Sequence, residues 1–245
     1  MGIMKIDYDR IASEYAAHRK VHPGVVAELI GHSAVTSGSK VLEVGCGTGN
    51  YAVAVRVLVG CSVWAVDPSE EMLARAKERS AEINFTLGTA EKLVFPSRSF
   101  DLVYSVDVVH HLSSQIDFFT EAHRVLNADG LICTVTDSEW IIRHREPLSV
   151  YFPETVENEL KRYPRIDELK KTMTEVGFSE VTESMVEFRY ELRDAQAYHD
   201  KAFSSLHMVS KDAFELGIER MERDLRNGPI KCTSRYALLW GTKPS

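Results

Sequence analysis

The 245-residue sequence lacks the features that would place it in a membrane, outside the cell or on nucleic acid. No apolar run approaches the roughly 18 residues that a membrane-spanning helix needs. The first residues, MGIMKIDYDRIASEY, have an acidic residue by position 7 and no apolar run, so we expect no secretory signal. Lys and Arg total 29 against 36 Asp and Glu, and the formal charge of −7 argues against broad binding of phosphate backbones. We expect a cytoplasmic protein whose partners include neither membranes nor nucleic acid.

Cysteine is scarce and scattered. The four cysteines form no CxxC pair and have no histidine nearby at metal-ligand spacing: Cys46, Cys61, Cys133 and Cys232. The sequence therefore gives no metal site and no disulfide framework, and free buried thiols in a reducing compartment are expected. Repeats, low-complexity tracts and long linkers are also missing, so we expect one domain with a helical insertion.

Short apolar runs alternate with helical patterns along most of the chain. Such alternation predicts right-handed crossovers and a parallel sheet, that is, an α/β fold. The expected strands are Lys40–Val44, Cys61–Val66, Ile83–Leu87, Phe100–Val106, Leu131–Thr136, Phe178–Glu191 and Tyr236–Gly241. The expected helices are Asp7–Arg19, Val25–Ile30, Tyr51–Val59, Ser69–Ala81, Gln115–Leu126 and Ile166–Val176, followed by a mostly helical segment over Asp194–Arg226.

A glycine-rich turn follows the first expected strand. Gly45, Gly47 and Gly49 allow positive φ and close approach of a ligand, although any tight strand–helix turn favours glycine. Asn50 stands where the dinucleotide fingerprint G-x-G-x-x-G has its last glycine. Glu43 lies in the apolar strand itself, where a carboxylate is costly without a partner. A cationic or hydrogen-bonding ligand would explain it.

Asp67 ends the second expected strand, 18 residues beyond Gly49. That distance is near the ~20 residues expected for a carboxylate that binds ribose hydroxyls. The alternative is that Asp67 caps the helix expected over Ser69–Ala81, since aspartate is common before a helix.

Four motifs stand in order: Glu43-x-Gly45-Cys-Gly47-Thr-Gly49, Asp67-Pro-Ser-x-x-Met72-Leu, Gly88-Thr-Ala90-Glu91-x-Leu-x-Phe-Pro96 and Ser99-Phe-Asp-Leu-Val-Tyr-Ser105. Together they resemble class I S-adenosylmethionine-dependent methyltransferases over residues 7–137, especially the small-molecule group that includes the menaquinone-biosynthesis type. The resemblance implies S-adenosyl-L-methionine as cofactor. It also implies a Rossmann-like seven-stranded, mostly parallel sheet of order 3-2-1-4-5-7-6, with the last strand antiparallel, helices on both faces and a helical insertion before the last strand.

The resemblance also implies which residues bind the cofactor. Gly45, Cys46 and Gly47 would lie against the methionine part of the cofactor, and Glu43 would lie near its amino group. Asp67 would bind the ribose, Pro68 and Met72 would lie beside the adenosine, and the adenine would be bound by Thr89, Ala90 and Glu91. Ser105 would offer its carbonyl to the cofactor, with His110 just beyond, and a lid helix would contain Tyr15 and Arg19. Thr89 departs from the family pattern, because many relatives carry aspartate there. The segment with Tyr15 and Arg19 also reads as a plain amphipathic surface helix.

Methyl transfer needs alignment and exclusion of water rather than a nucleophilic side chain. No catalytic residue is assigned. His110 and His111 follow the fourth strand, at the edge where ligands bind in open α/β folds, and could orient or deprotonate an acceptor. A role in shaping the cofactor site is the alternative for both.

The segments after the fifth strand would choose the acceptor. Asp137, Glu139 and Trp140 end that strand at the same edge of the sheet. A loose basic cluster could bind an anionic group or be a solvated helix face: Arg143, His144, Arg145, Arg162 and Arg165. Aromatic residues could line an acceptor pocket or fill the core of the insertion: Trp140, Tyr151, Phe152, Tyr163, Tyr198 and Phe203.

These observations predict a methyltransferase acting on a small-molecule acceptor. A nicotinamide-dependent oxidoreductase and a non-catalytic, cofactor-binding regulatory domain are the alternatives. The fourth strand ends Ser105-Val-Asp-Val, unlike the Asn/Asp-Pro-Pro-Tyr/Phe of adenine-DNA and glutamine methyltransferases. We expect a single domain with residues 1–22 as lid, 23–137 as cofactor-binding core, 138–232 on the substrate side and 233–245 as last strand. A homodimer is compatible with the sequence.

Overall fold

A computed structural model describes residues 21–245 and contains a seven-stranded sheet of order β3-β2-β1-β4-β5-β7-β6. The strands are β1 (Lys40–Val44), β2 (Ser62–Asp67), β3 (Asn84–Leu87), β4 (Phe100–Val106), β5 (Leu126–Thr136), β6 (Ser179–Leu192) and β7 (Ile230–Thr242). Neighbouring strands from β3 to β5 pair in parallel, and β7 runs antiparallel to both β5 and β6. The predicted fold class and strand order are confirmed.

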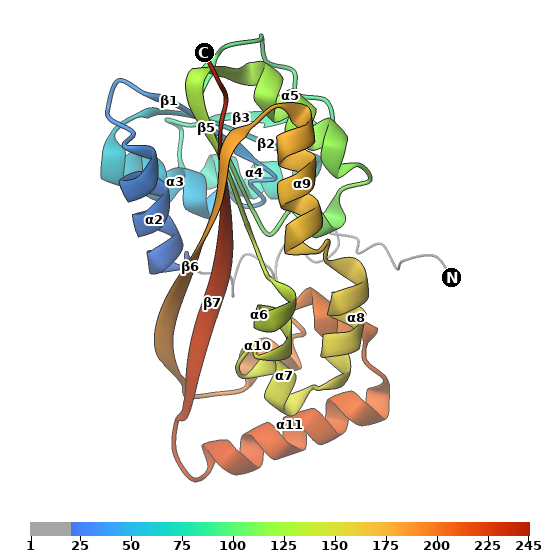
Figure 1. Ribbon diagram of the computed structural model, residues 1–245. Helices are drawn as coiled ribbons and strands as arrows, with labels where there is room; N and C mark the ends of the chain where they lie inside the picture. The colour runs from blue at the N-terminus through green and yellow to red at the C-terminus, as the bar shows by residue number, and fades with distance from the viewer. Residues whose placement is uncertain (1–20) are drawn as a thin grey trace.

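Helices cover both faces of the sheet (Figure 1). They are α2 (Pro23–Ser33), α3 (Asn50–Val59) and α4 (Glu70–Arg79) on one face, with α5 (Gln115–Val125) and α9 (Ile166–Val176) on the other. Their boundaries follow local chemistry: Ser69 caps α4 by accepting from the Met72 N–H at 3.1 Å, and Gly177, with φ +112°, ends α9. The apolar faces of these helices bury the sheet in two hydrophobic cores.

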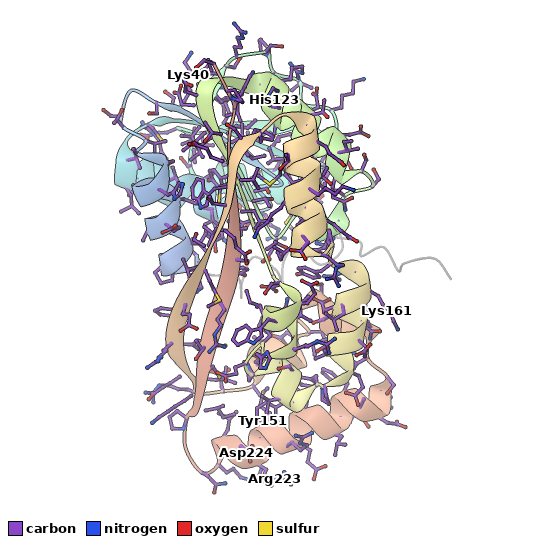
Figure 2. All side chains as sticks on the ribbon, in the orientation of Figure 1. Lys40, His123, Tyr151, Lys161, Arg223 and Asp224 are labelled. Carbon is purple, nitrogen blue, oxygen red and sulfur yellow. The ribbon has the colours of Figure 1, made fainter. Side chains whose placement is uncertain are left out.

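A helical cap lies beyond the carboxyl ends of the parallel strands (Figure 1). It contains α6 (Glu139–Arg143), α7 (Leu148–Tyr151), α8 (Glu154–Arg162), α10 (Gln196–His199), the 3₁₀ turn η2 (Ser204–Met208) and α11 (Lys211–Leu225). Its own apolar core includes Phe152, Tyr198 and Met221. The Tyr151 hydroxyl donates to Asp224 at 2.8 Å and ties α7 to α11, at the opposite end of the molecule from Lys40, which begins β1 (Figure 2).

The last two strands form a ribbon that connects the sheet to the cap (Figure 1). β7 pairs with β5 only as far as Ala237, opposite Thr136, whereas its pairing with β6 continues to Ile230, opposite Leu192. The prediction of a strand over Tyr236–Gly241 was therefore too short. The missed part, IKCTSR, is mostly polar because the ribbon is not buried between helices, so it gives no apolar run.

Other departures are small. β5 begins at Leu126, where the sequence predicts the end of a helix, and the segment after β5 forms three short helices that were not predicted separately. Within residues 21–245, no helix combines the length and the apolar character needed to cross a membrane.

Candidate functional site

The glycine-rich turn between β1 and α3 is held against the end of β2. The backbone N–H groups of Gly45 and Cys46 both donate to the carbonyl of Val66, at 2.7 and 3.0 Å. Gly45 has φ +73°, and a Cβ added there would lie 2.4 Å from Cγ2 of Val108. Glycine is thus required by backbone conformation and by the close approach of the chain that follows β4. The turn forms one wall of a cavity of about 50 Å³.

Glu43 lies near the carboxyl end of β1 and lines this small cavity. Its carboxyl group is buried and accepts a hydrogen bond from the Tyr104 hydroxyl at 3.2 Å. Burial raises the pKa of Glu43 to about 8, although hydrogen bonding lowers it in part. A cationic ligand group would restore the ionised form. The residue therefore fits the amino group expected of the cofactor.

Asp67 stands at the end of β2, beside the same turn. Its carboxylate accepts from the backbone N–H of Gly47 at 2.7 Å and from that of Ser69 at 3.0 Å. Because Ser69 is the residue that caps α4, the alternative of Asp67 as the helix cap is wrong. A carboxylate has about four acceptor positions, so these two contacts leave capacity for hydroxyl groups. Binding of ribose by Asp67 stays a prediction.

The other predicted cofactor residues lie near this edge but do not line the small cavity. The Gly88 N–H donates to the carbonyl of Asp67 at 3.1 Å, which brings the segment with Thr89, Ala90 and Glu91 beside β2. The Glu91 carboxylate accepts from the N–H and hydroxyl of Ser113, at 3.0 and 2.9 Å. Pro68 is exposed and Met72 is buried. The Ser105 hydroxyl forms a hydrogen bond with the Thr134 hydroxyl at 2.6 Å. Tyr15 and Arg19 lie outside the described residues.

Several residues of the small cavity were missed at the level of sequence: Thr48, Asn50, Tyr51, Val106, Asp107 and Tyr236. Asp107 had a signal, because it directly follows β4 at the ligand-binding edge. Tyr236 had none, since it comes from a strand 129 residues further along, yet its hydroxyl donates to Asp107 at 3.0 Å. The buried hydroxyl of Thr48 has no hydrogen-bond partner within residues 21–245. A polar ligand in the small cavity would supply one.

A larger cavity of about 110 Å³ adjoins the first and shares Asp107 and Tyr236 with it. Its walls come from the 3₁₀ turn η1 (Val109–His111), the segment after β5, α8, the cap and the β6–β7 ribbon. Unlike the small cavity, it is lined largely by charged and aromatic side chains. The polar lining includes Asp137, Arg145, Glu146, Glu159, Ser204, Ser205, Ser234 and Arg235.

Arg145 is the centre of a buried ion network in that wall. It forms ion pairs with Asp137 and with Glu159, the latter at 3.1 Å, and Arg162 pairs with Glu159 at 3.3 Å. Burial alone would lower the pKa of Arg145, but Tyr163, Glu159 and nearby acids hold it above its usual value. The two arginines are thus already neutralised by carboxylates.

The predicted basic cluster is therefore not one unit, and its interpretation as a solvated helix face is wrong for its central members. Arg145 and Arg162 are held inside by acids, whereas Arg143 and His144 are exposed and Arg165 pairs at the surface with Glu139 at 3.3 Å. Residues that are close in sequence therefore differ in burial and in ion-pair partners. Neither buried arginine is an open cation for an anionic acceptor.

The aromatic candidates also divide. Tyr163, Tyr198 and Phe203 line the larger cavity, whereas Tyr151 and Phe152 belong to the core of the cap. Trp140 is half exposed and stacks on His144, with ring centroids 4.4 Å apart.

The two candidate histidines differ in their surroundings. His110 stacks on Tyr163 with ring centroids 3.9 Å apart, and His111 is exposed. Both line the larger cavity, and neither lines the small one. A role for His110 beside the cofactor stays a prediction.

Comparison with known proteins points to one family. Residues 42–134 match the family described as "Methyltransferase domain". A demethylmenaquinone methyltransferase of Staphylococcus aureus is 26% identical over 199 residues, which cover 71% of this chain and 81% of that protein. The sterol 24-C-methyltransferase of Pneumocystis carinii is 26% identical over 159 residues, 60% of this chain, and the match spans only 41% of its length.

A solved structure extends the similarity to the fold. A protein of Anabaena variabilis described as a methyltransferase from an antibiotic biosynthesis pathway superposes with a TM-score of 0.72 at 26% identity, covering 89% of this chain and 96% of that one. The antiparallel β7 between β5 and β6 also differs from the order 3-2-1-4-5-6 of dinucleotide-binding sheets, which argues against the oxidoreductase alternative. Residues 42–134 thus match a methyltransferase domain, and the fold around them is that of class I S-adenosylmethionine-dependent methyltransferases.

Proposed function

We propose that this protein transfers a methyl group from S-adenosylmethionine to a small-molecule acceptor in the cytoplasm. The observation that carries the proposal is the pair of adjoining cavities at the carboxyl edge of the sheet, which share Asp107 and Tyr236. The small cavity adjoins the glycine turn, and the larger one adjoins the cap. A cofactor and an acceptor bound side by side have the arrangement that an in-line transfer needs.

The cofactor would be held mainly by the small cavity. When bound, S-adenosylmethionine supplies an electrophilic methyl group on a sulfonium. Glu43 would bind its amino group, Gly45 and Gly47 would allow close approach of the backbone, and Asp67 would bind the ribose. The adenosine would lie toward the remaining members of the predicted set: Pro68, Met72, Thr89, Ala90, Glu91 and the carbonyl of Ser105.

The predicted lid is supported by the point at which the chain enters the fold. The His22 N–H donates to the Tyr51 hydroxyl at 3.0 Å, and the His22 ring packs edge-on against Tyr236 with centroids 5.4 Å apart. Both tyrosines line the small cavity. His22 therefore joins the fold beside the small cavity, and the lid role of Tyr15 and Arg19, which lie outside the described residues, stays a prediction.

Two measurements test the proposal. Isothermal titration should show that the protein binds S-adenosylmethionine and S-adenosylhomocysteine but not NAD; the reverse result would favour the oxidoreductase. Incubation with methyl-labelled S-adenosylmethionine and a metabolite extract should then label a small molecule. Cofactor binding with no labelled product from extracts of several sources would favour the non-catalytic regulatory domain.

Two further assignments accompany the proposal. The four free, buried cysteines suit a reducing cytoplasm. We assign residues 23–137 to the cofactor and residues 138–232 to the acceptor within one domain. The homodimer stays a prediction, which light scattering on the purified protein would check.

A further inference from the structure

The boundary between the two cavities is narrow. Among residues 21–245, only Asp107 and Tyr236 line both cavities. The atom that receives the methyl group must lie next to the cofactor, so it must lie beside these two side chains. His110 and His111 reach only the larger cavity and stand further from that position.

Asp107 is held in place by backbone and side-chain contacts. Its N–H donates to the carbonyl of Val135 in β5 at 3.0 Å, and its carboxylate accepts from the Tyr236 hydroxyl at 3.0 Å. Its φ of +58° lies in the left-handed region, which aspartate tolerates better than most residues. Such backbone conformations are costly and persist where the surroundings fix them, often at functional sites. A carboxylate only accepts hydrogen bonds when ionised, so it selects an acceptor group that carries N–H or O–H.

The charges of the larger cavity favour a cation over an anion. Its carboxylates belong to Asp107, Asp137, Glu146 and Glu159, and its guanidinium groups to Arg145 and Arg235. Both arginines are committed to acids, Arg145 within the buried network and Arg235 to Glu187 at 2.7 Å. Counted over carboxylates and guanidinium groups, the surplus in the lining is negative, and a negative cleft concentrates cations and repels carboxylates and phosphates.

Glu146 supplies part of that surplus. One of its oxygens accepts from the Thr233 N–H at 2.9 Å, and it forms no ion pair within residues 21–245. Tyr190 and Tyr198 also line this cavity, with the Tyr198 ring stacked on Phe152 and Phe203. A wall of this kind suits an ammonium group and gives no pairing for an anionic one.

We infer that the acceptor is an amine and that Asp107 is the catalytic carboxylate that holds its nitrogen and takes its proton. This inference rests on the proposed function. An amine that arrives protonated gives a proton to Asp107, which frees the nitrogen lone pair. The lone pair forms the new N–C bond, the S–CH₃ bond breaks, and the electron pair of that bond remains on sulfur. The proton on Asp107 then passes to water.

The test combines a panel of acceptors with one substitution and a matched control. Methyl-labelled S-adenosylmethionine is offered with primary and secondary amines, phenols, thiols and quinols. We expect label on amines. Asp107→Asn keeps the shape of the side chain and removes the base, so kcat/KM for the labelled amine should fall about 10²–10⁴-fold. The binding of S-adenosylhomocysteine should change little.

The pH profile separates a base from a structural role. In Asp107→Asn the rate should recover as the pH rises toward the pKa of the amine itself, because free amine then needs no base. Asp129→Asn is the control, since Asp129 also has a positive φ, +60°, but is exposed near the start of β5. Tyr236→Phe is the second variant if Asp107→Asn fails to fold, with a smaller loss of kcat expected.

Each outcome is decisive. Label on phenols, thiols or quinols with inert amines overturns the inference and leaves the methyltransferase proposal standing. Wild-type rate and pH profile in Asp107→Asn, or in Tyr236→Phe where Asp107→Asn does not fold, overturn the role of Asp107. If the wild-type protein neither binds S-adenosylmethionine nor labels any acceptor, the proposed function itself fails.

Discussion

Cofactor binding should release a proton, and Glu43 should be its source. Burial raises the pKa of Glu43 to about 8, so its carboxyl group is mainly protonated at pH 7 in the free protein. The cofactor's α-amino group is mainly a cation at this pH, since such groups titrate near about 7.7–8.0. Bringing the ammonium to Glu43 favours the carboxylate and drives the proton off.

The magnitude follows from the pKa. With a value of about 8, close to nine-tenths of the Glu43 side chains are protonated at pH 7. The cofactor's amino group takes up about 0.1 proton as it becomes fully charged, so about 0.8 protons in net should leave per cofactor bound. Between about pH 5.5 and 7 the affinity should rise close to tenfold per pH unit, or about 1.4 kcal/mol, because each unit lowers the cost of ionising Glu43 by that amount. Above about pH 8 the gain should end as the ammonium itself loses its proton.

Isothermal titration at pH 7 in two buffers of different ionisation enthalpy measures the released proton directly. The apparent binding enthalpy should differ between phosphate and Tris by about 0.8 times the difference in their ionisation enthalpies. Glu43→Gln should abolish that difference and flatten the affinity between pH 5.5 and 7. Glu78→Gln, at an exposed position on α4, should leave both unchanged. A wild-type enthalpy that is the same in both buffers would refute the reasoning.

Other substitutions test the turn and the ion network. Gly45→Ala should lower the free energy of unfolding in urea titrations by about 2–4 kcal/mol, because the new Cβ requires a positive φ and overpacks against Val108. Adding Val108→Ala should recover the part of this loss that comes from the steric overlap. Full stability in Gly45→Ala alone would contradict the contact with Val108. Asp67→Ala should weaken binding of S-adenosylhomocysteine by about 1–3 kcal/mol, and unchanged affinity in the folded variant would remove Asp67 from the site. Arg145→Met leaves the buried Asp137 carboxylate without its ion-pair partner and Glu159 with Arg162 alone, and should cost about 3–5 kcal/mol of stability, against about 1 or less for the exposed pair in Arg165→Met; equal costs would show that the Arg145 network is not effectively buried.

The sheet and the cofactor side could be predicted from sequence because their signals are local. Strands buried on both faces read as apolar runs, so β1 to β5 stand out, and the turn after β1 is marked by glycines whose positive φ is a property of a few adjacent residues. Glu43 could be identified from sequence for the same reason. A carboxylate inside an apolar strand needs a partner wherever that strand lies in the fold. The structure supplied the partner, Tyr104, from the neighbouring strand.

The acceptor side could not be predicted in the same way because it is built from long-range contacts between polar segments. Arg145 looked like a member of a surface cluster until Asp137 and Glu159 enclosed it from two other elements. The polar half of β7 carries no hydrophobic pattern, and Tyr236 meets Asp107 across 129 residues of sequence. Composition and periodicity give no sign of such pairs.

Tyr236 lies at the point where β7 changes its partners. From Ile230 to Tyr236 the strand pairs with β6 alone, and from Ala237 to Thr242 it also pairs with β5. One of the two residues that line both cavities therefore stands where the sheet passes into the ribbon.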